Sequence, residues 1–244
     1  MAEIIEMENV TFQVQSQTIV KNFSFQFEEG KTTALVGPSG SGKSTVLKLA
    51  AGVLVPTIGD VRFRGKDIFL MNRKENLDFR REASMVFQDS ALWSNQSLHQ
   101  ILALPMRIHF PGMSAGDIDR RMKEVLAEVG YKKELSIRPS RLSMGEQKLI
   151  AFARAMMISP TLLFLDEWTE SLDENAARRL MDLVRSHQKE NRTVIFVCHD
   201  FRIVRSLADY VVMIQGGELF LKLSSEQMNE DEDLAKYVER GIAS

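Results

Sequence analysis

The stretch "TTALVGPSGSGKST", residues 32–45, decides the fold of this 244-residue chain. It opens on a short, mostly apolar run of the kind that buried parallel strands show. Glycines and serines follow, and residues 43–51 are predicted to form a helix. Glycines let the backbone curl so that its N–H groups face inward, where they can bind phosphate oxygens. We therefore expect a strand, a phosphate-binding loop and a helix, in this order.

Residues 37–45, "GPSGSGKST", fit the Walker A pattern, because Gly37 and Gly42 are separated by four residues and Lys43 and Ser44 follow. In that pattern the lysine carries positive charge to the β- and γ-phosphates of a nucleotide, and the serine hydroxyl can ligate Mg²⁺. A dinucleotide-binding turn is excluded because its third glycine is absent after Gly42. The predicted nucleotide contacts of this loop are Gly37, Pro38, Ser39, Gly40, Ser41, Gly42, Lys43, Ser44 and Thr45.

Two carboxylates end a second apolar strand, "TLLFLDE", residues 161–167. Asp166 suits Mg²⁺, usually through water, and Glu167 is placed to polarise a water molecule in line with the γ-phosphate. His199 closes the strand "TVIFVCH", residues 193–199, and is expected at the sheet edge where ligands bind, in contact with the γ-phosphate. No Asn-Lys-x-Asp motif for guanine occurs, so ATP is favoured over GTP.

Strand and helix patterns alternate through the last third of the chain, which indicates a parallel α/β core. Residues 4–27 and 59–68 instead have the pattern of antiparallel strands. From residue 88 to residue 141 the pattern is helical. The predicted fold is α/β, a P-loop NTPase parallel-sheet core with an N-terminal antiparallel β lobe and an inserted helical lobe. We expect one domain, residues 1–244, with residues 88–141 as a helical subdomain within it.

Composition narrows the class of protein. The formal net charge is −2, which argues against a broad nucleic-acid footprint. Cys198 is the one cysteine, so no internal disulfide can form and nothing points to secretion. The acidic N-terminus lacks the pattern of a signal peptide, and no run approaches the roughly 18 apolar residues of a membrane span. We expect a cytoplasmic protein that does not bind nucleic acid.

The stretch "RLSMGEQKLIAFARA", residues 141–155, predicts both a core helix and an anion site. Ser143 and Glu146 have the spacing of a capping box, in which the serine caps a helix and the glutamate reaches back. The almost wholly apolar run that follows is typical of a buried helix. Gly145 leaves the start of this helix bare, and a bare helix N-terminus attracts anions.

In this order, these elements resemble the ATP-binding subunits of ABC transporters over nearly the whole chain. "GPSGSGKST" is similar to that family's Walker A motif, and "LFLDE" to its Walker B motif. "LSMGEQ" resembles its signature motif, "VFQD" its Q-loop, "ESLD" its D-loop and "CHD" its switch-histidine motif. Because all of these motifs occur in register, the resemblance is far more specific than any one of them alone.

The resemblance implies an ATP-hydrolysing motor subunit that binds ATP and Mg²⁺. Such a subunit forms a head-to-tail dimer, as a homodimer or with a paired ABC subunit, around two ATP molecules. The signature helix of each subunit binds the γ-phosphate held by the other subunit, and hydrolysis lets the halves part. The implied roles are catalysis by Glu167, His199 and Gln88; metal binding by Ser44, Gln88 and Asp166; signature contacts in trans by Ser143, Met144, Gly145 and Glu146; and a D-loop at Asp173.

Several residues depart from the family's usual pattern, although Lys43, Asp166, Glu167 and His199 match it. We therefore expect an active but slow ATPase. The departures are Met144 and Glu146 for the glycine and glutamine of the signature, Trp168 for the proline after the catalytic glutamate, and Glu170 with Ser171 for the Ser-Ala of the D-loop.

The adenine contact is matched only in part. Phe12 lies near the place of the aromatic residue that stacks on adenine in this family, but Val14 occupies the position itself. Both residues are predicted to line the adenine side of the site, with weak stacking.

A subunit without a membrane span needs a separate integral membrane permease in order to transport anything. The natural docking place is the cleft beside the helical lobe and Gln88, and ordinary core packing explains only part of the apolar side chains there. We expect Trp93 and Leu98 to contact the permease, because tryptophan is enriched at interface anchors. The apolar set is Ala91, Leu92, Trp93, Leu98, Ile101, Leu102 and Leu104.

Residues 87–109 also resemble the corresponding run of bacterial Mla/Mce-type lipid transport ATPases. This implies a phospholipid or other hydrophobic cargo, with uptake of polar solutes and export of lipids as the other possibilities. It also implies peripheral attachment to the cytoplasmic face of the inner (plasma) membrane. The acidic tail, residues 224–244, is expected either as a short helix for a small regulatory subunit or as a solvated end.

Two other functions fit part of the pattern. A soluble ABC-type ATPase acting on DNA or ribosomes is disfavoured, because the chain has neither a long coiled-coil insertion nor a second domain of this kind. A nucleotide-gated structural subunit that binds ATP but barely hydrolyses it is favoured only by the departures at Met144 and Trp168.

Overall fold

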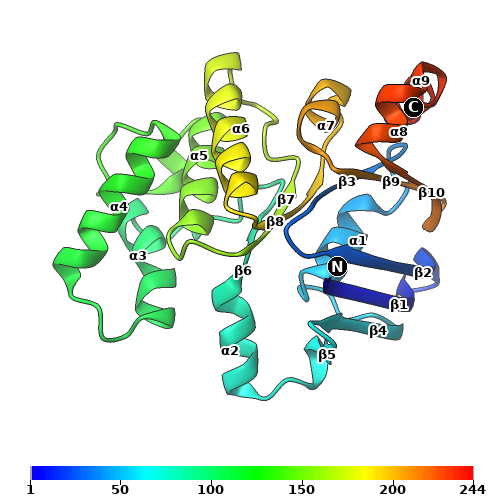
Figure 1. Cartoon of the computed structure of the whole chain (residues 1–244). Coiled ribbons are helices and arrows are strands. Elements are labelled where there is room, and N and C mark those ends of the chain that lie inside the picture. Colours follow the sequence, from blue (N-terminus) through cyan, green and yellow to red (C-terminus); the bar gives the residue numbers. More distant parts are fainter. Residues whose placement is uncertain (1, 244) are drawn as a thin grey trace.

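The computed structural model describes residues 2–243, which form two sheets surrounded by helices (Figure 1). The larger sheet has the strand order β10-β9-β3-β8-β7-β6, and its neighbouring strands are parallel except for β10 and β9. β3, β7 and β8 are buried along their whole length, as parallel strands covered on both faces are. The strands are β3 (Thr32–Val36), β6 (Ala83–Val86), β7 (Leu162–Asp166), β8 (Thr193–Val197), β9 (Tyr210–Gln215) and β10 (Glu218–Ser224).

The smaller sheet is antiparallel, with the strand order β2-β1-β4-β5. Its inner face is apolar, and Phe23, Phe25 and Phe27 pack there in one core with α1 and one face of the larger sheet. The smaller sheet therefore supports the phosphate-binding loop from one side. Its strands are β1 (Glu3–Val14), β2 (Gln17–Glu28), β4 (Ile58–Phe63) and β5 (Lys66–Asp67).

The opposite face of the larger sheet is covered by helices that form a second core. Figure 1 shows α3, α4 and α5 gathered at the end of the molecule away from the antiparallel sheet. The predicted α/β fold, with its antiparallel lobe and inserted helices, is confirmed. The helices are α1 (Lys43–Ala50), η1 (Ile68–Leu70), α2 (Arg73–Glu82), α3 (Leu98–His109), α4 (Ala115–Val129), η2 (Pro139–Arg141), α5 (Met144–Met156), α6 (Glu174–Lys189), α7 (Phe201–Leu207), α8 (Ser225–Glu230) and α9 (Glu232–Ala243).

The sequence patterns did not predict α2 and β6. α2 is almost wholly polar and buries Phe79 alone, so it has no apolar stripe, although Asn72 and Glu75 form a capping box at its start. β6 is short and lies at the edge of the sheet beside β7. Contacts with residues distant in the chain, which a local pattern does not contain, stabilise both elements. β6 pairs with β7, and Arg80 of α2 donates hydrogen bonds to the carbonyl oxygens of Ala51 and Gly52.

The region between residues 88 and 141 is not helical throughout. Residues 88–97 form turns, and α3 begins after Ser97, which makes a capping box with Gln100. The prediction that Leu98 contacts a permease is wrong, because this side chain is 0% exposed among the packed helices. Trp93 is 45% exposed, as a docking residue must be.

The acidic tail forms α8 and α9 and is not a solvated end. Ala235, Val238 and Ile242 of α9 are buried, and α9 packs against α7 and β3. Tyr237 stays half-exposed and stacks on Phe220 of β10, with ring centroids 6.3 Å apart. Among residues 2–243, no helix is long and apolar enough to cross a membrane.

Replacing Leu98 with alanine should lower the free energy of unfolding by about 2–5 kcal/mol, because it leaves a cavity in a fully buried site. Urea denaturation measures the change. Trp93→Ala, which removes a half-exposed ring from the neighbouring loop, is the matched control and should cost much less. Equal losses in the two variants would contradict this placement of Leu98.

Candidate active site

The phosphate-binding loop follows β3 and needs glycine at two positions. Gly37 has φ 140°, and a Cβ there would lie 2.1 Å from the carbonyl oxygen of Ile214. Gly42 has φ 98°, and a Cβ there would lie 2.9 Å from the carbonyl oxygen of Ile19. A side chain at either position would therefore push the loop away from β9 or β2.

Lys43 lies under this loop and is 6% exposed. Its Nζ donates hydrogen bonds of 2.8 Å to the carbonyl oxygens of Gly37 and Pro38. Burial lowers the pKa of Lys43, and the nearby carboxylates of Glu167 and Asp166 partly offset that effect. A buried ammonium group enclosed by the loop is a strong attractor for the phosphate oxygens of a nucleotide.

Asp166 ends β7 and is 0% exposed. Its Oδ1 accepts a 2.7 Å hydrogen bond from Ser44 Oγ of α1, while its Oδ2 has no hydrogen-bond partner and lies 3.6 Å from Lys48 Nζ. A buried carboxylate oxygen without a hydrogen bond, beside a serine hydroxyl, fits Mg²⁺, which needs few protein ligands and takes the rest from phosphate and water. The described residues include no cluster of three or more His, Cys, Asp or Glu that would hold a metal by itself.

Glu167 and His199 meet at the carboxyl ends of neighbouring strands, since β7 pairs with β8 up to Asp166 and Val197. His199 Nε2 lies 2.9 Å from Glu167 Oε1. Burial raises the pKa of Glu167, His199 opposes this shift, and Asp166 adds to it. A carboxylate with a raised pKa is a stronger general base for water.

Two local features distinguish the chain at Glu167 and the residue after it. Its backbone is in the left-handed region, with φ 45°, a strained conformation that structures keep mainly at functional sites. Trp168, the next residue, is 0% exposed and packs against Phe152 of α5, with ring centroids 6.0 Å apart. The Trp168 side chain, which departs from the family pattern, therefore points into the helical core and anchors the loop.

The signature stretch forms the predicted capping box, which is confirmed. Ser143 Oγ accepts from the N–H of Glu146, whose side chain accepts from the N–H of Ser143. Met144 is 72% exposed, so its side chain lies outside the packed core. A Cβ on Gly145 would lie 2.8 Å from the carbonyl oxygen of Ser171, so the bare helix start also lets the D-loop approach.

Asp173, Phe12 and Val14 are the remaining predicted residues. Asp173 caps α6 by accepting a 2.9 Å hydrogen bond from the N–H of Ala176. Phe12 pairs with Val20 beside the phosphate-binding loop and is half-buried. Val14 is 50% exposed at the end of β1.

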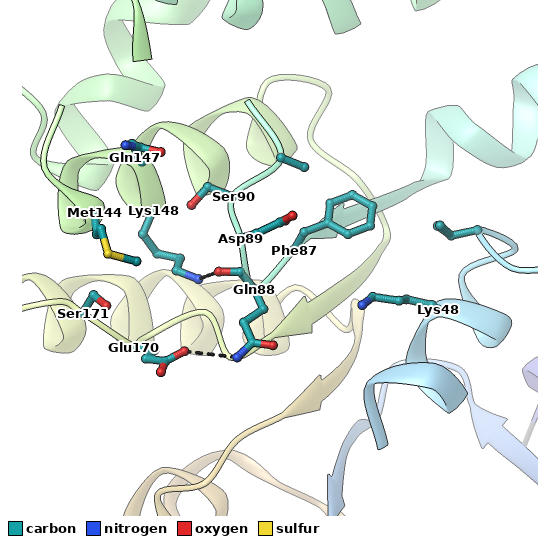
Figure 2. A pocket seen from close by; sticks show the side chains of 12 residues that line it. Lys48, Phe87, Gln88, Asp89, Ser90, Met144, Gln147, Lys148, Glu170 and Ser171 are labelled. Atoms are coloured by element: carbon teal, nitrogen blue, oxygen red, sulfur yellow. Dashed lines mark hydrogen bonds between the residues drawn. The ribbon is translucent and has the colours of Figure 1, made fainter. Parts of the chain in front are cut away.

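Gln88 follows β6 and lines a cavity of about 710 Å³ with Lys48, Met144, Lys148, Glu170 and Ser171 (Figure 2). Its Nε2 lies 3.4 Å from Oε2 of Glu170, and its main-chain carbonyl oxygen accepts a hydrogen bond from Lys148 Nζ. Lys148 is 3% exposed, and burial lowers its pKa.

The sequence patterns missed Lys148 as a site residue. The available signal was a lysine inside the apolar run of α5, because a lysine is almost never fully buried without partners.

Comparison with known proteins shows to which family this chain is similar. The family model described as ABC transporter matches residues 20–170. The chain is 34% identical over 232 residues to the intermembrane phospholipid transport system ATP-binding protein MlaF of Haemophilus influenzae, covering 95% of this chain and 88% of that protein. It is 31% identical over 233 residues to the methionine import ATP-binding protein MetN of Clostridium acetobutylicum, covering 91% and 72%.

A solved dimeric structure of the ATP-binding cassette MJ0796, in a post-hydrolysis state bound to ADP and Pi, is also similar. It superposes with a TM-score of 0.84 at 26% identity, and the match covers 91% of this chain and 99% of that one. The motifs, the fold and the relatives lead to one conclusion. The chain belongs to the ABC transporter family, as an ATP-binding subunit that hydrolyses ATP to drive transport.

Proposed function

We propose that hydrolysis takes place where β3, β7 and β8 end, with Glu167 as the general base. The observation that carries this proposal is the 2.9 Å approach of His199 to Glu167, next to the Ser44–Asp166 pair. Glu167 takes a proton from the attacking water, and His199 orients that carboxylate and contacts the γ-phosphate.

In this proposal the loop of residues 37–45 and Lys43 bind the phosphates of ATP. Ser44, Asp166 and Gln88 hold Mg²⁺, which neutralises charge on the phosphates when it is bound. The orphaned Oδ2 of Asp166 supports the metal site. Phe12 and Val14 lie on the side of the adenine ring.

We further propose that a second subunit completes the binding site of the γ-phosphate in trans. Its contacts are Ser143, Met144, Gly145 and Glu146, and Asp173 belongs to the D-loop between the two subunits. The exposed start of α5 supports this arrangement. The dimeric relative bound to ADP and Pi supports it as well. Closing the dimer around two ATP molecules and opening it after hydrolysis is the mechanical step.

The chain acts in this proposal as one ATPase domain, residues 1–244, whose subdomain of residues 88–141 docks on an integral membrane permease. This places it at the cytoplasmic face of the inner membrane. Phospholipid or another hydrophobic molecule is the proposed cargo, because MlaF is matched over nearly the full length of both chains. The stacked Phe220 and Tyr237 at the C-terminal helices are the place proposed for a small regulatory subunit.

Glu167→Gln should reduce ATP turnover by about 10²–10⁴-fold, because general-base catalysis contributes that much. ATP binding should persist, so the variant should accumulate as an ATP-bound dimer in size-exclusion chromatography with light scattering. Lys43→Ala is the control and should not dimerise with ATP. Equal turnover in Glu167→Gln and the unmodified protein would reject Glu167 as the base and favour a subunit that barely hydrolyses ATP.

Trp93→Ala should weaken retention of the permease at least about 10-fold, since exposed tryptophans are frequent interface anchors. Co-purification from detergent-solubilised membranes measures retention, and fluorescent-nucleotide titration should show unchanged affinity for ATP. Leu70→Ala removes a side chain that is 80% exposed on η1 and serves as the control. Recovery with ribosomes or DNA in place of a membrane protein would contradict the transporter function.

A further inference from the structure

Gln88 is held at two points by charged side chains from two different elements (Figure 2). Lys148 of α5 donates to its main-chain carbonyl oxygen. Glu170, in the loop between β7 and α6, lies with Oε2 3.4 Å from the Nε2 of its side chain. Lys148 thus contacts the backbone of Gln88, and Glu170 contacts its side-chain amide.

In the structure the NH₂ end of the Gln88 amide faces Glu170, across 3.4 Å between two exposed side chains. A carboxylate has only acceptors, so the NH₂ end of the amide must turn toward Glu170. The Oε1 end then turns the other way, and Figure 2 shows it on the side of the cavity from which Lys48 enters. A serine, the family's usual residue at this position, both donates and accepts and would not select one orientation.

Lys48, which lies on the side to which Oε1 turns in Figure 2, also approaches the carboxylate proposed to bind the metal. Lys48 Nζ lies 3.6 Å from Asp166 Oδ2, the oxygen without a hydrogen bond. An amide oxygen turned to this side is a ligand that Mg²⁺ accepts, whereas an amide NH₂ group is not.

Lys148 supplies the positive charge that this arrangement requires. Glu170 adds a carboxylate to a site that already contains Asp166 and Glu167, and like charges close together destabilise one another. The Lys148 ammonium is 3% exposed and interacts electrostatically with all three of these carboxylates and with Asp89. It therefore offsets the added negative charge while it holds the backbone of Gln88.

We propose that Glu170 is a positioning residue, which turns the side-chain oxygen Oε1 of Gln88 toward the bound cation. Lys148 is the counter-charge of Glu170. This inference rests on the proposed role of Gln88 as a metal ligand. Glu170 stands where the family usually has serine, and the inference gives this replacement a function in metal binding.

The test uses a fluorescent, non-hydrolysable ATP analogue and the complete chain. Its Kd is measured with saturating Mg²⁺ and again in EDTA, and the ratio of the two values reports how strongly the metal aids nucleotide binding. Glu170→Gln keeps the size of the side chain but can donate as well as accept, so the amide loses its fixed orientation. We expect the ratio to fall by about 10-fold, as loss of a group that orients a metal ligand does, with the Kd in EDTA unchanged.

Three further variants make the result decisive. Gln88→Ala should lower the ratio to a similar extent, and Gln88→Ala with Glu170→Gln should lower it no further, because both act through one amide. Glu174→Gln, whose side chain is 86% exposed and pairs with Arg178, is the matched control and should keep the original ratio. Melting temperatures identify any variant that does not fold, and Glu170→Ala then replaces Glu170→Gln.

The outcomes separate the two claims. A lowered ratio for Gln88→Ala with an unchanged ratio for Glu170→Gln overturns the positioning role and leaves Gln88 as a ligand. An unchanged ratio for Gln88→Ala overturns the metal role of Gln88, and the positioning role with it. If Glu170→Gln changes only the Kd measured in EDTA, Glu170 only shapes the cavity, and this result also overturns the inference.

Discussion

The active site depends on the hydrogen bond between Ser44 and Asp166. It joins the phosphate-binding loop and α1, which follow β3, to the end of β7, and Asp166 has no exposure to water. Because parallel strands end at a common edge, this contact brings the loop beside Glu167 and the residues after β8. A carboxylate buried this deeply needs compensation, and the Ser44 hydroxyl and the Lys48 ammonium supply it until a metal ion binds.

The residues that make the site reactive also oppose folding. Lys43 and Lys148 are buried ammonium groups, and burial lowers the pKa of both. Glu167 combines a raised pKa with a left-handed backbone. The two apolar cores on the faces of the larger sheet are the main source of stability that offsets these costs. A strained and charged edge on a well-packed sheet suits a protein that must bind, hydrolyse and release a nucleotide.

One helix, α5, connects the proposed nucleotide contact to the loop proposed for docking. Its first turn contains Ser143 and the bare Gly145, and Lys148 contacts the backbone of Gln88 one turn later. Farther along, Arg154 donates to the carbonyl oxygens of Ser90 and Ala91 and lies 5.5 Å from the centre of the Trp93 ring. Movement of α5 would therefore be transmitted directly to the exposed tryptophan proposed to contact the permease.

The sequence by itself determined the features that depend on local chemistry. Glycine spacing predicted the loop at residues 37–45, apolar runs that end in carboxylates predicted β7, and the Ser143–Glu146 pair predicted the start of α5. Tertiary structure decided what depends on neighbours distant in the chain. Trp93 and Leu98 belong to the same set of apolar side chains, yet the first is half-exposed and the second fully buried, because only packing against the other helices distinguishes them. For the same reason the contact between Glu170 and Gln88, 82 positions apart, became visible only when β6 and β7 were paired in the sheet.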